Sequence, residues 1–334
     1  MRRGGVSAKR GVAAVLAAGG AIALASPALG ATNGRIAFQA SVDRFPQVFT
    51  INADGTGLTQ VTRVPASDPG FDPGGENPSW SPDGTTIAFD TGNRKGVNLW
   101  KVNPDGSSLI EVPLGVGDFN GNPAYSPDGS RISFDWDRGF PSKQHGIFIA
   151  NADGSAARRL TIAPRTVEAH DTESQWSPDG TRIAFTRVSR IGRAAVFVIG
   201  VDGTGLRRLT PWRLDAASPD WSPDGTRILF NTHFDPRPGQ SANLYSMRPD
   251  GSRRRALTQH RGGRAHSFRP SWAPDGSRIV FARYAPARKG VDLYTMKPDG
   301  TGVTRLTDMP RRFAVNPDWG IAPSPTTART ASGG

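Results

Sequence analysis

The sequence predicts an all-β fold: a six-bladed β-propeller of four-stranded antiparallel blades, closed by a C-terminal strand that completes the first blade. Three observations support this prediction. One hairpin motif occurs five times, a second hairpin motif occurs six times between its copies, and the two ends of the repeated region each carry half of a missing hairpin. A repeat of roughly 40–50 residues built from short strands is typical of propellers and related arrays.

The first motif is an aromatic residue followed by Ser-Pro-Asp-Gly, or once by Ala-Pro-Asp-Gly, and then by an apolar run. Proline presets φ at the first central position of the turn, aspartate can bond the local backbone, and glycine accepts a positive φ. The Ile-x-Phe run that follows is typical of a strand buried on both faces. Each copy is therefore predicted to be a β-hairpin whose aromatic residue packs in the core. The copies begin at Trp80, Tyr125, Trp176, Trp221 and Trp272.

The second motif is a strand-like run that ends in Asp-Gly, which is a strong hairpin signal. Its glycines are Gly55, Gly106, Gly154, Gly203, Gly251 and Gly300. The first motif supplies strands A and B of a repeat, and the second supplies strands C and D. Residues 33–38 form a strand B that no strand A precedes, and residues 316–319 form a strand A that no strand B follows. We therefore expect the C-terminal strand to complete the first blade.

The ends of the chain differ from the repeats. A basic segment over residues 2–10, an apolar run and a small-residue stretch predict a secretory signal peptide over residues 1–30, with an uncleaved anchor as the alternative. The propeller is expected over residues 31–322 and a disordered tail over residues 323–334. We expect an exported protein, periplasmic or extracellular, that is monomeric and does not span the membrane after cleavage. The chain contains no cysteine, so disulfides do not stabilise it.

The repeats resemble the WD40-like (PD40) repeats of the TolB-type propeller family over about residues 33–322. The resemblance implies a β-propeller. A separate α/β domain precedes the propeller in TolB itself, and we expect that domain to be absent here because the repeats begin directly after the predicted signal peptide.

The two faces of the predicted propeller differ. The A–B and C–D turns would form one face, the turn face, from short and uniform turns. The B–C and D–A connections would form the other, the loop face, from long and dissimilar loops. Because binding residues concentrate on variable loops held by a rigid scaffold, function is predicted on the loop face.

A ring of polar residues is predicted where the innermost strands meet the loop face. These residues stand three positions before the aromatic of each strand A, and ligand binding and strand capping are both open for them. They are Asn77, Asn122, Glu173, Ser218, Arg269 and Asn316. Arg237, in a B–C loop, is the seventh candidate ligand-binding residue, one of a group of B–C arginines that also includes Arg187 and Arg283. With a formal net charge of +12, such loops would attract anionic partners.

Catalytic signals are weak. Gly-x-Ser-x-Gly is absent, which argues against a peptidase of the nucleophile-elbow type. His170, His233 and His266 fall in loops of the loop face, and in the related oligogalacturonate lyases such histidines hold a metal. The sequence therefore favours a non-catalytic propeller without a cofactor that binds a protein or a cell-envelope ligand. The alternative is a metal-assisted lyase or hydrolase that acts on an anionic polysaccharide and uses a divalent metal held by these histidines.

Arginines at the outer edge of the blades have a structural interpretation. Arg158, Arg207 and Arg254 lie on or just before strand D, where charge prevents edge-to-edge pairing. No nucleic-acid partner is expected from them.

Overall fold

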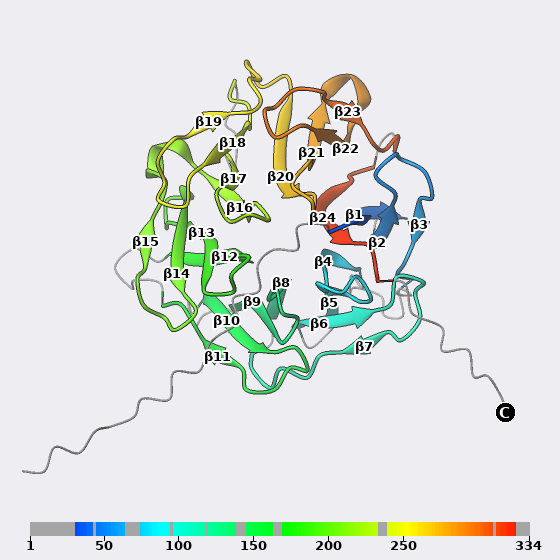
Figure 1. Cartoon of the computed structure of the whole chain (residues 1–334), viewed down its shortest axis with the longest axis vertical. Helices are drawn as coiled ribbons and strands as arrows, with labels where there is room; N and C mark the ends of the chain where they lie inside the picture. The colour runs from blue at the N-terminus through cyan, green and yellow to red at the C-terminus, as the bar shows by residue number, and fades with distance from the viewer. Residues whose placement is uncertain are drawn as a thin grey trace, which may run out of the picture.

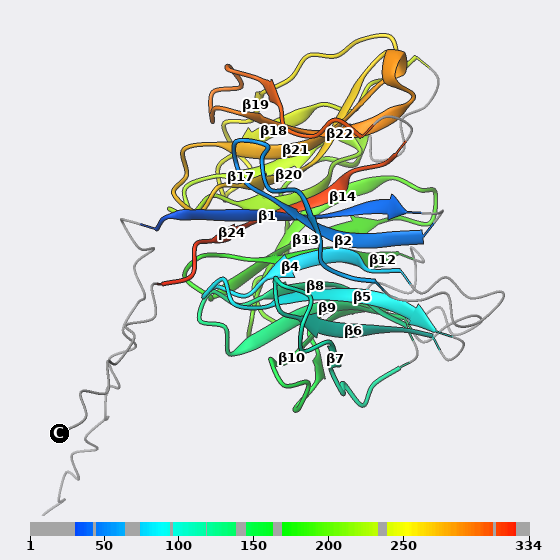
Figure 2. The same ribbon diagram turned by 90° about the vertical axis from the view of Figure 1, so that its right-hand side faces the viewer.

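A computed structural model describes residues 31–42, 45–63, 74–93, 96–117, 119–137, 145–162, 169–232, 239–309 and 312–324. The described strands form a ring of sheets around a central axis, with strand A of each repeat innermost (Figure 1). In the side view the strands run across the thickness of the ring, and β1 begins at the turn face (Figure 2). The predicted signal peptide and the tail beyond residue 324 lie outside the described residues.

Four of the sheets contain four antiparallel strands each. The first contains, from the axis outward, β24 (Val315–Ile321), β1 (Asn33–Val42), β2 (Phe45–Ile51) and β3 (Thr59–Gln60). The second contains β12 (His170–Trp176), β13 (Arg182–Val188), β14 (Ala194–Gly200) and β15 (Arg207–Arg208). The third contains β16 (Ala217–Trp221), β17 (Ile228–Asn231), β18 (Leu244–Met247) and β19 (Arg255–Ala256). The fourth contains β20 (His266–Trp272), β21 (Ile279–Ala285), β22 (Gly290–Met296) and β23 (Thr304–Arg305).

The remaining strands form one eight-stranded sheet. It contains β4 (Glu76–Trp80), β5 (Ile87–Asn93), β6 (Gly96–Val102), β7 (Ile110–Glu111), β8 (Phe119–Tyr125), β9 (Arg131–Asp137), β10 (His145–Asn151) and β11 (Arg158–Arg159). A parallel pairing of β6 with β8, at Val97 and Phe119, joins its two halves.

The prediction of six separate blades is therefore wrong. The described chain forms four blades of four antiparallel strands and one eight-stranded sheet. The repeat motifs could not show this, because the pairing between β6 and β8 lies at the loop-face starts of the two strands, outside both motifs. A single backbone pairing there is enough to merge two repeats into one sheet.

The chain termini meet in the first sheet. β24 pairs antiparallel with β1, and the register places Trp319 opposite Ile36 and Asp318 opposite Ala37. The last described backbone bond of this pair runs from the Ala322 N–H to the Thr32 carbonyl at 2.8 Å. The closure that the incomplete end repeats predict is thus observed at the level of strand pairing.

The core lies between neighbouring sheets. The phenylalanine of every strand B has no exposed surface, and these residues are Phe38, Phe89, Phe134, Phe185, Phe230 and Phe281. The tryptophans that precede the turns are also buried, as predicted, with exposed fractions of 5–8%. Since each sheet is apolar on both faces, stacking around the ring buries surface that no single sheet could bury alone.

The A–B turns form as the motif predicts. In the first of them, Asp83 Oδ1 accepts hydrogen bonds from Ser81 Oγ at 2.6 Å and from the Thr85 N–H at 3.0 Å, while the Gly84 N–H donates to the Ser81 carbonyl at 2.9 Å. The five motif glycines have φ between +66° and +73°. Each turn therefore satisfies its own polar groups and requires no external partner.

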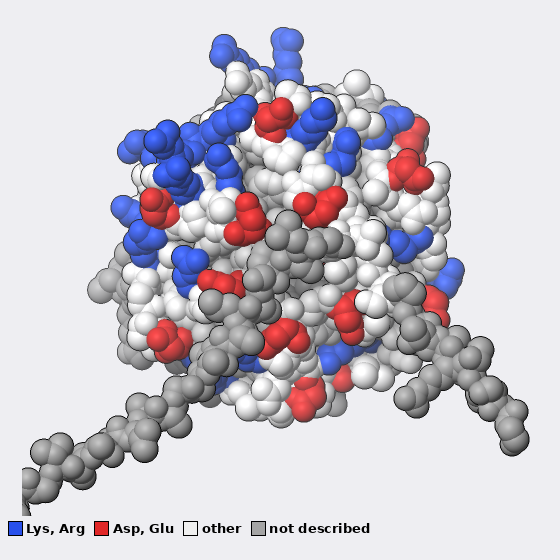
Figure 3. Space-filling model, viewed as in Figure 1, with Lys and Arg blue, Asp and Glu red and all other residues white. Residues whose placement is uncertain are grey.

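Arginines of the short outer strands link neighbouring repeats. Arg158 donates to the Val201 carbonyl, Arg207 to the Pro249 carbonyl at 3.0 Å, and Arg255 to the Asp299 carbonyl at 3.2 Å. Each acceptor lies in the C–D turn of the following repeat. On the turn face, Lys and Arg gather over β15 and β19, and Asp and Glu lie nearer to the axis (Figure 3). The outer arginines thus join adjacent blades as well as placing charge on their edges.

The two described helices are single 3-10 turns, η2 (Trp212–Leu214) and η3 (Pro286–Arg288). In the described part of the chain, no helix has the length and apolar character needed to cross a membrane.

Candidate functional site

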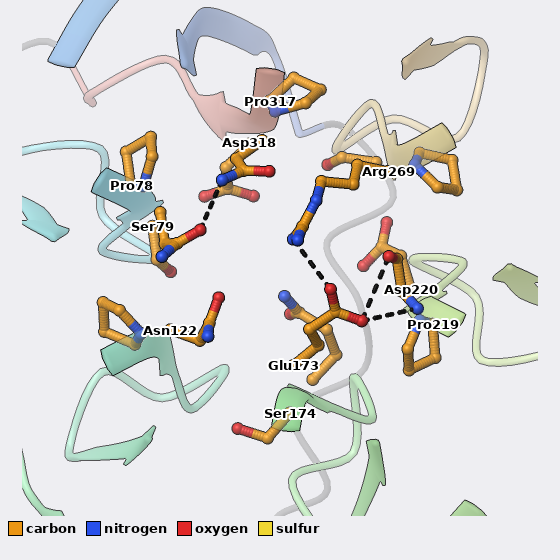
Figure 4. Close-up of a pocket in the computed structure, with 17 residues that line it drawn as sticks. Pro78, Ser79, Asn122, Glu173, Ser174, Pro219, Asp220, Arg269, Pro317 and Asp318 are labelled. Atoms are coloured by element: carbon orange, nitrogen blue, oxygen red, sulfur yellow. Dashed lines mark hydrogen bonds and ion pairs between the residues drawn. The ribbon is translucent and has the colours of Figure 1, made fainter. Parts of the chain in front are cut away.

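The six predicted ring residues come together around the central channel (Figure 4). They line one cavity, and each comes from the innermost strand of a different repeat. They are Asn77, Asn122, Glu173, Ser218, Arg269 and Asn316. Their convergence, which the spacing from the aromatic residues predicts, makes this ring the candidate site.

All six ring residues share an unusual backbone conformation. Their φ angles lie between 48° and 56°, in the left-handed region that non-glycine residues seldom adopt. Each stands at or beside an irregularity in the pairing of strand A with strand B, as between Thr172 and Gln175. The bulge turns the ring residue toward the axis. The repeat motifs do not predict this backbone conformation, although asparagine, which tolerates positive φ, occupies three of the six positions.

A polar residue of the preceding repeat supports most of these bulges. Asp90 Oδ1 accepts a hydrogen bond from the Asn122 N–H at 3.0 Å, and Asp135 Oδ1 accepts one from the Glu173 N–H at 3.1 Å. The same position supplies Gln39, Thr186 and Asn231 as acceptors for Asn77, Ser218 and Arg269. Each of these acceptors directly follows the buried phenylalanine of a strand B. A polar residue at that position of an otherwise apolar strand is the sequence signal from which the acceptors could have been predicted.

The support differs at the sixth position, where Ala282 follows the phenylalanine. Alanine has no side-chain acceptor, and Asn316 is held through its own amide instead. Asn316 Nδ2 donates to Gln39 Oε1 at 2.8 Å and to Asn77 Oδ1. The closing strand is therefore fastened to the first two repeats around the ring.

The two charged ring residues form an ion pair across the channel mouth. Arg269 Nη1 lies 2.9 Å from Glu173 Oε1, and Glu173 is only 8% exposed. Glu173 Oε2 also accepts hydrogen bonds from Thr186 Oγ1 and from the Ser218 N–H, both at 2.9 Å. These contacts give Glu173 a structural role in holding the second and third sheets together.

A second polar layer lies deeper in the channel, directly before the buried tryptophans. Asp220 Oδ2 accepts a hydrogen bond from the Trp272 N–H at 2.7 Å, and Asp318 Oδ2 accepts one from the Trp80 N–H at 2.6 Å. Burial raises the pKa of Asp220 to about 8 and that of Asp318 to about 6. Asp220 is therefore mostly protonated at neutral pH.

The volume of the channel cavity limits what it can hold. The cavity measures about 80 Å³, and a water molecule occupies roughly 30 Å³ in the liquid. In this conformation the cavity has room for a few water molecules but not for a large side chain such as that of tryptophan. A ligand of the ring would therefore contact its outer edge.

The structure separates two of the predicted histidines. His170 lies in a cavity beside His145, with 5.9 Å between the ring centroids. His266 lines another cavity with Phe268 and Tyr284. His233 and Arg237 fall outside the described residues, and within the described ranges no three His, Asp or Glu side chains are grouped as metal ligands would be.

Two of the arginines predicted in B–C loops lie in strands and have different partners. Arg187 is not a loop residue as predicted: it lies in β13 and forms a buried ion pair with Asp171, with Nε 2.6 Å from Oδ1 and Nη2 2.8 Å from Oδ2. Arg283 lies in β21, where Ser267 takes the place of the aspartate. The strands extend further toward the loop face than the motifs indicate, so these two arginines are not available for an anionic partner in the way that a loop residue would be.

Together the fold and the site define a closed β-propeller whose innermost strands present a polar ring to one face. The family model of the TolB beta propeller domain (PD40) matches residues 114–322. This range is more than half of the chain, and the chain therefore belongs to the TolB-type propeller family.

Relatives in sequence include a TolB homolog of Chlorobium luteolum, which is 30% identical over 219 residues and is matched over 65% of this chain and 45% of its own length. An uncharacterized protein of Agrobacterium fabrum is 29% identical over 144 residues, which cover 42% of this chain and 47% of that protein. The match thus spans about half the length of these relatives.

Solved structures share the fold. A candidate TolB from Agrobacterium tumefaciens has a TM-score of 0.65 at 21% identity, covering 87% of this chain and 99% of that one. TolB from Acinetobacter baumannii has a TM-score of 0.65 at 20% identity, covering 86% and 66%.

Proposed function

We propose that this chain is an exported, non-catalytic propeller that binds a protein or a cell-envelope ligand through its loop face. The observation that carries the proposal is the convergence of six polar residues around the central channel. On the opposite face the A–B and C–D turns satisfy their own polar groups internally, whereas the loop face carries the long and dissimilar connections on which binding residues concentrate. Export is inferred from the signal-peptide pattern of the first thirty residues.

Within this proposal the ring residues bind the ligand at their outer edge. Asn77, Asn122, Ser218 and Asn316 supply amide and hydroxyl groups, and Arg269, which is 32% exposed, supplies a cation. Glu173 orients Arg269 through their ion pair. Arg237 is proposed as a further contact from its B–C loop. The similarity of the chain to a TolB homolog supports a binding role for the propeller.

The test is capture of the native partner from an envelope fraction by purified protein carrying double arginine substitutions. Arg269→Gln with Arg312→Gln changes the loop face, and Arg227→Gln with Arg248→Gln is the matched change on the turn face. Three of the four substituted arginines are exposed, namely Arg227, Arg248 and Arg312, and Arg269 is partly exposed.

We expect the loop-face variant to lose the protein or envelope component that the unaltered chain retains. It should keep a cooperative thermal transition at a lower melting temperature, because Glu173 loses its ion-pair partner. The turn-face variant should retain it. Loss on the turn-face variant alone would reverse the assignment of the faces and overturn the proposal.

A further inference from the structure

A second cavity opens on the loop face next to the ring. Its volume is about 540 Å³, which lies within the usual 300–1,000 Å³ range of ligand pockets and far exceeds the channel cavity. Its lining includes Ala242, His266, Phe268, Tyr284, Phe313 and Val315. We call it the aromatic pocket. It lies where β20, β21 and β22 meet the start of the closing strand β24.

The walls of the aromatic pocket are flat rings. His266 and Tyr284 have centroids 5.8 Å apart, and His266 Nδ1 accepts a hydrogen bond from the Ala242 N–H at 3.2 Å, which fixes its orientation. Burial lowers the pKa of His266, so the imidazole is neutral at pH 7. Phe268, Tyr284 and Val315 pack against the largest core cluster and form a floor that is continuous with the interior. The floor of the pocket is therefore held in place by the core.

Phe313 stands at the edge of this pocket with 51% of its surface exposed. Its backbone is fixed, because the Val291 N–H donates to the Arg312 carbonyl at 3.0 Å and the Ala314 N–H donates to the Val291 carbonyl at 2.9 Å. An exposed phenylalanine on a fixed backbone leaves apolar surface in water at a cost of about 25 cal/mol per Å². A flat apolar group placed against it would remove that surface from water with little loss of side-chain entropy.

The one charged residue in the lining of the pocket is basic, and its acidic partner Glu173 lies outside the lining. None of its lining residues is an aspartate or a glutamate, and its one ionised lining residue is Arg269. Arg312, next to Phe313 in the chain, is exposed. Glu173 occupies one nitrogen of Arg269, and a guanidinium carries five N–H donors. The pocket therefore combines aromatic walls with a basic edge.

We propose that the aromatic pocket receives an aromatic side chain of an acidic segment of the protein partner. This inference rests on the proposed function and names the anchor within it. The aromatic ring enters between Phe313, Tyr284 and Phe268, and a neighbouring carboxylate of the segment pairs with Arg269 or Arg312. Buried aromatic anchors of this kind contribute most of the binding energy in many interfaces.

The test uses fluorescein-labelled peptides of glutamate, glycine and serine with one central tryptophan, and fluorescence anisotropy as the readout. We expect the tryptophan peptide to bind the intact chain, and versions with alanine for tryptophan or lysine for glutamate to bind at least about tenfold more weakly. Phe313→Ala should weaken binding of the tryptophan peptide by about tenfold. Since Phe313 is half exposed, this variant should fold like the wild type.

The matched control is Phe119→Ala. Phe119 is 43% exposed and lines a different cavity of the loop face, so peptide binding should not change. Equal effects of the two substitutions, or equal binding of the alanine peptide, would overturn the inference. So would displacement of the peptide by indole-3-acetate at an affinity equal to that of the peptide, which would identify a small-molecule site.

Native capture separates this inference from the proposed function. If Phe313→Ala retains the native partner at the wild-type yield while the Arg269 and Arg312 double variant loses it, the pocket is not the anchor and the loop-face function stands. If neither variant affects capture, the proposed function fails as well. Loss of the partner with Phe313→Ala, together with the tryptophan-dependent peptide binding, supports both.

Discussion

Asp220 shows how a single residue couples the channel to pH. Its carboxyl group is buried beside Asp318, and burial raises its pKa to about 8. The folded state therefore favours the protonated form. The stability that this preference contributes is complete below the ordinary pKa of about 4 and is lost as the pH rises toward 8. The wild type should accordingly be less stable at pH 8 than at pH 5 on account of this group.

We expect Asp220→Asn to remove this loss. Asparagine keeps an oxygen that can accept the hydrogen bond from the Trp272 N–H. Its amide group does not ionise, so its burial costs the same at every pH. Urea unfolding should give similar stability for variant and wild type below about pH 4, a growing advantage of the variant above it, and a clearly more stable variant at pH 8. Asp318→Asn should gain its advantage over the wild type between about pH 4 and pH 6 and keep it at higher pH, because the pKa of Asp318 is about 6. A variant that is no more stable than the wild type at pH 8 would show that Asp220 is ionised without penalty.

The ion pair of Arg187 with Asp171 is a second effect at the scale of the residue. The two side chains are 4% and 0% exposed, and their contact is bidentate. Removing one partner of a buried pair leaves an uncompensated charge, which typically costs about 3–5 kcal/mol. We expect Asp171→Ala to lower the free energy of unfolding by an amount in this range, measured by urea denaturation.

Ser267→Ala is the matched substitution in β20, because Ser267 pairs with Arg283 as Asp171 pairs with Arg187. Ser267 makes one side-chain contact, with His260 Nε2 at 2.8 Å, and its loss should cost about 1 kcal/mol. Similar costs for the two substitutions would mean that the ion pair contributes little beyond an ordinary hydrogen bond.

At the scale of the element, the A–B turns share one conformation but have different surroundings. Gly84 and Gly276 have φ of +70° and +73°. A Cβ on Gly84 would lie 2.4 Å from the carbonyl oxygen of Ile321 in β24, whereas a Cβ on Gly276 would meet nothing within 4 Å. The first turn therefore touches the closing strand, and the last turn is open.

We expect Gly276→Ala to cost about 1–2 kcal/mol, the penalty for a Cβ in the left-handed region. Gly84→Ala should cost clearly more, because the Ile321 backbone must also move. Thermal or urea unfolding of the two variants measures the difference directly. Equal costs would mean that the backbone of the closing strand moves away from the new Cβ at Gly84 without a measurable loss of stability.

The elements also show how far the sequence determines the structure. Both hairpin motifs act through local turn chemistry, and for this reason the strands, the turn glycines and the position of the ring could be predicted. The ion pair of Glu173 with Arg269 joins two repeats that are not adjacent in the chain, so a repeat pattern does not reveal it. Two other features depend on how far the strands extend past the motifs, which the motifs do not specify. They are the pairing of Val97 with Phe119 and the position of Arg187 in a strand instead of the predicted loop.

At the scale of the whole molecule, neighbouring repeats are held by contacts that recur around the ring. Lys101 donates to the Ala152 carbonyl, and Arg207 and Arg255 make the corresponding contacts further along the chain. Nearer the axis, the acceptors that follow five of the six buried phenylalanines bind the backbone of the next ring residue. Closure lets the first and last repeats share in these contacts, because a ring has no open end.

We therefore expect the closing strand to contribute far more to the stability of the fold than its seven residues suggest. β24 pairs with β1, buries Trp319 at 5% exposure in the core, and binds Gln39 and Asn77 through Asn316. Truncation before Asn316 removes all of these contacts and leaves β1 as an open inner edge. We expect the truncated chain to lose its cooperative thermal transition, measured by circular dichroism.

Two further variants show whether strand pairing is the cause. Removing residues 323–334 should shift the melting temperature by no more than about 2 °C, since the last described backbone bond of the closing strand is that of Ala322. Trp319→Ala keeps the strand but creates a cavity, and should cost about 3–5 kcal/mol while leaving a cooperative transition. If the chain truncated before Asn316 melted at the same temperature as the chain lacking only residues 323–334, the ring would not depend on β24 and the termini would only lie side by side.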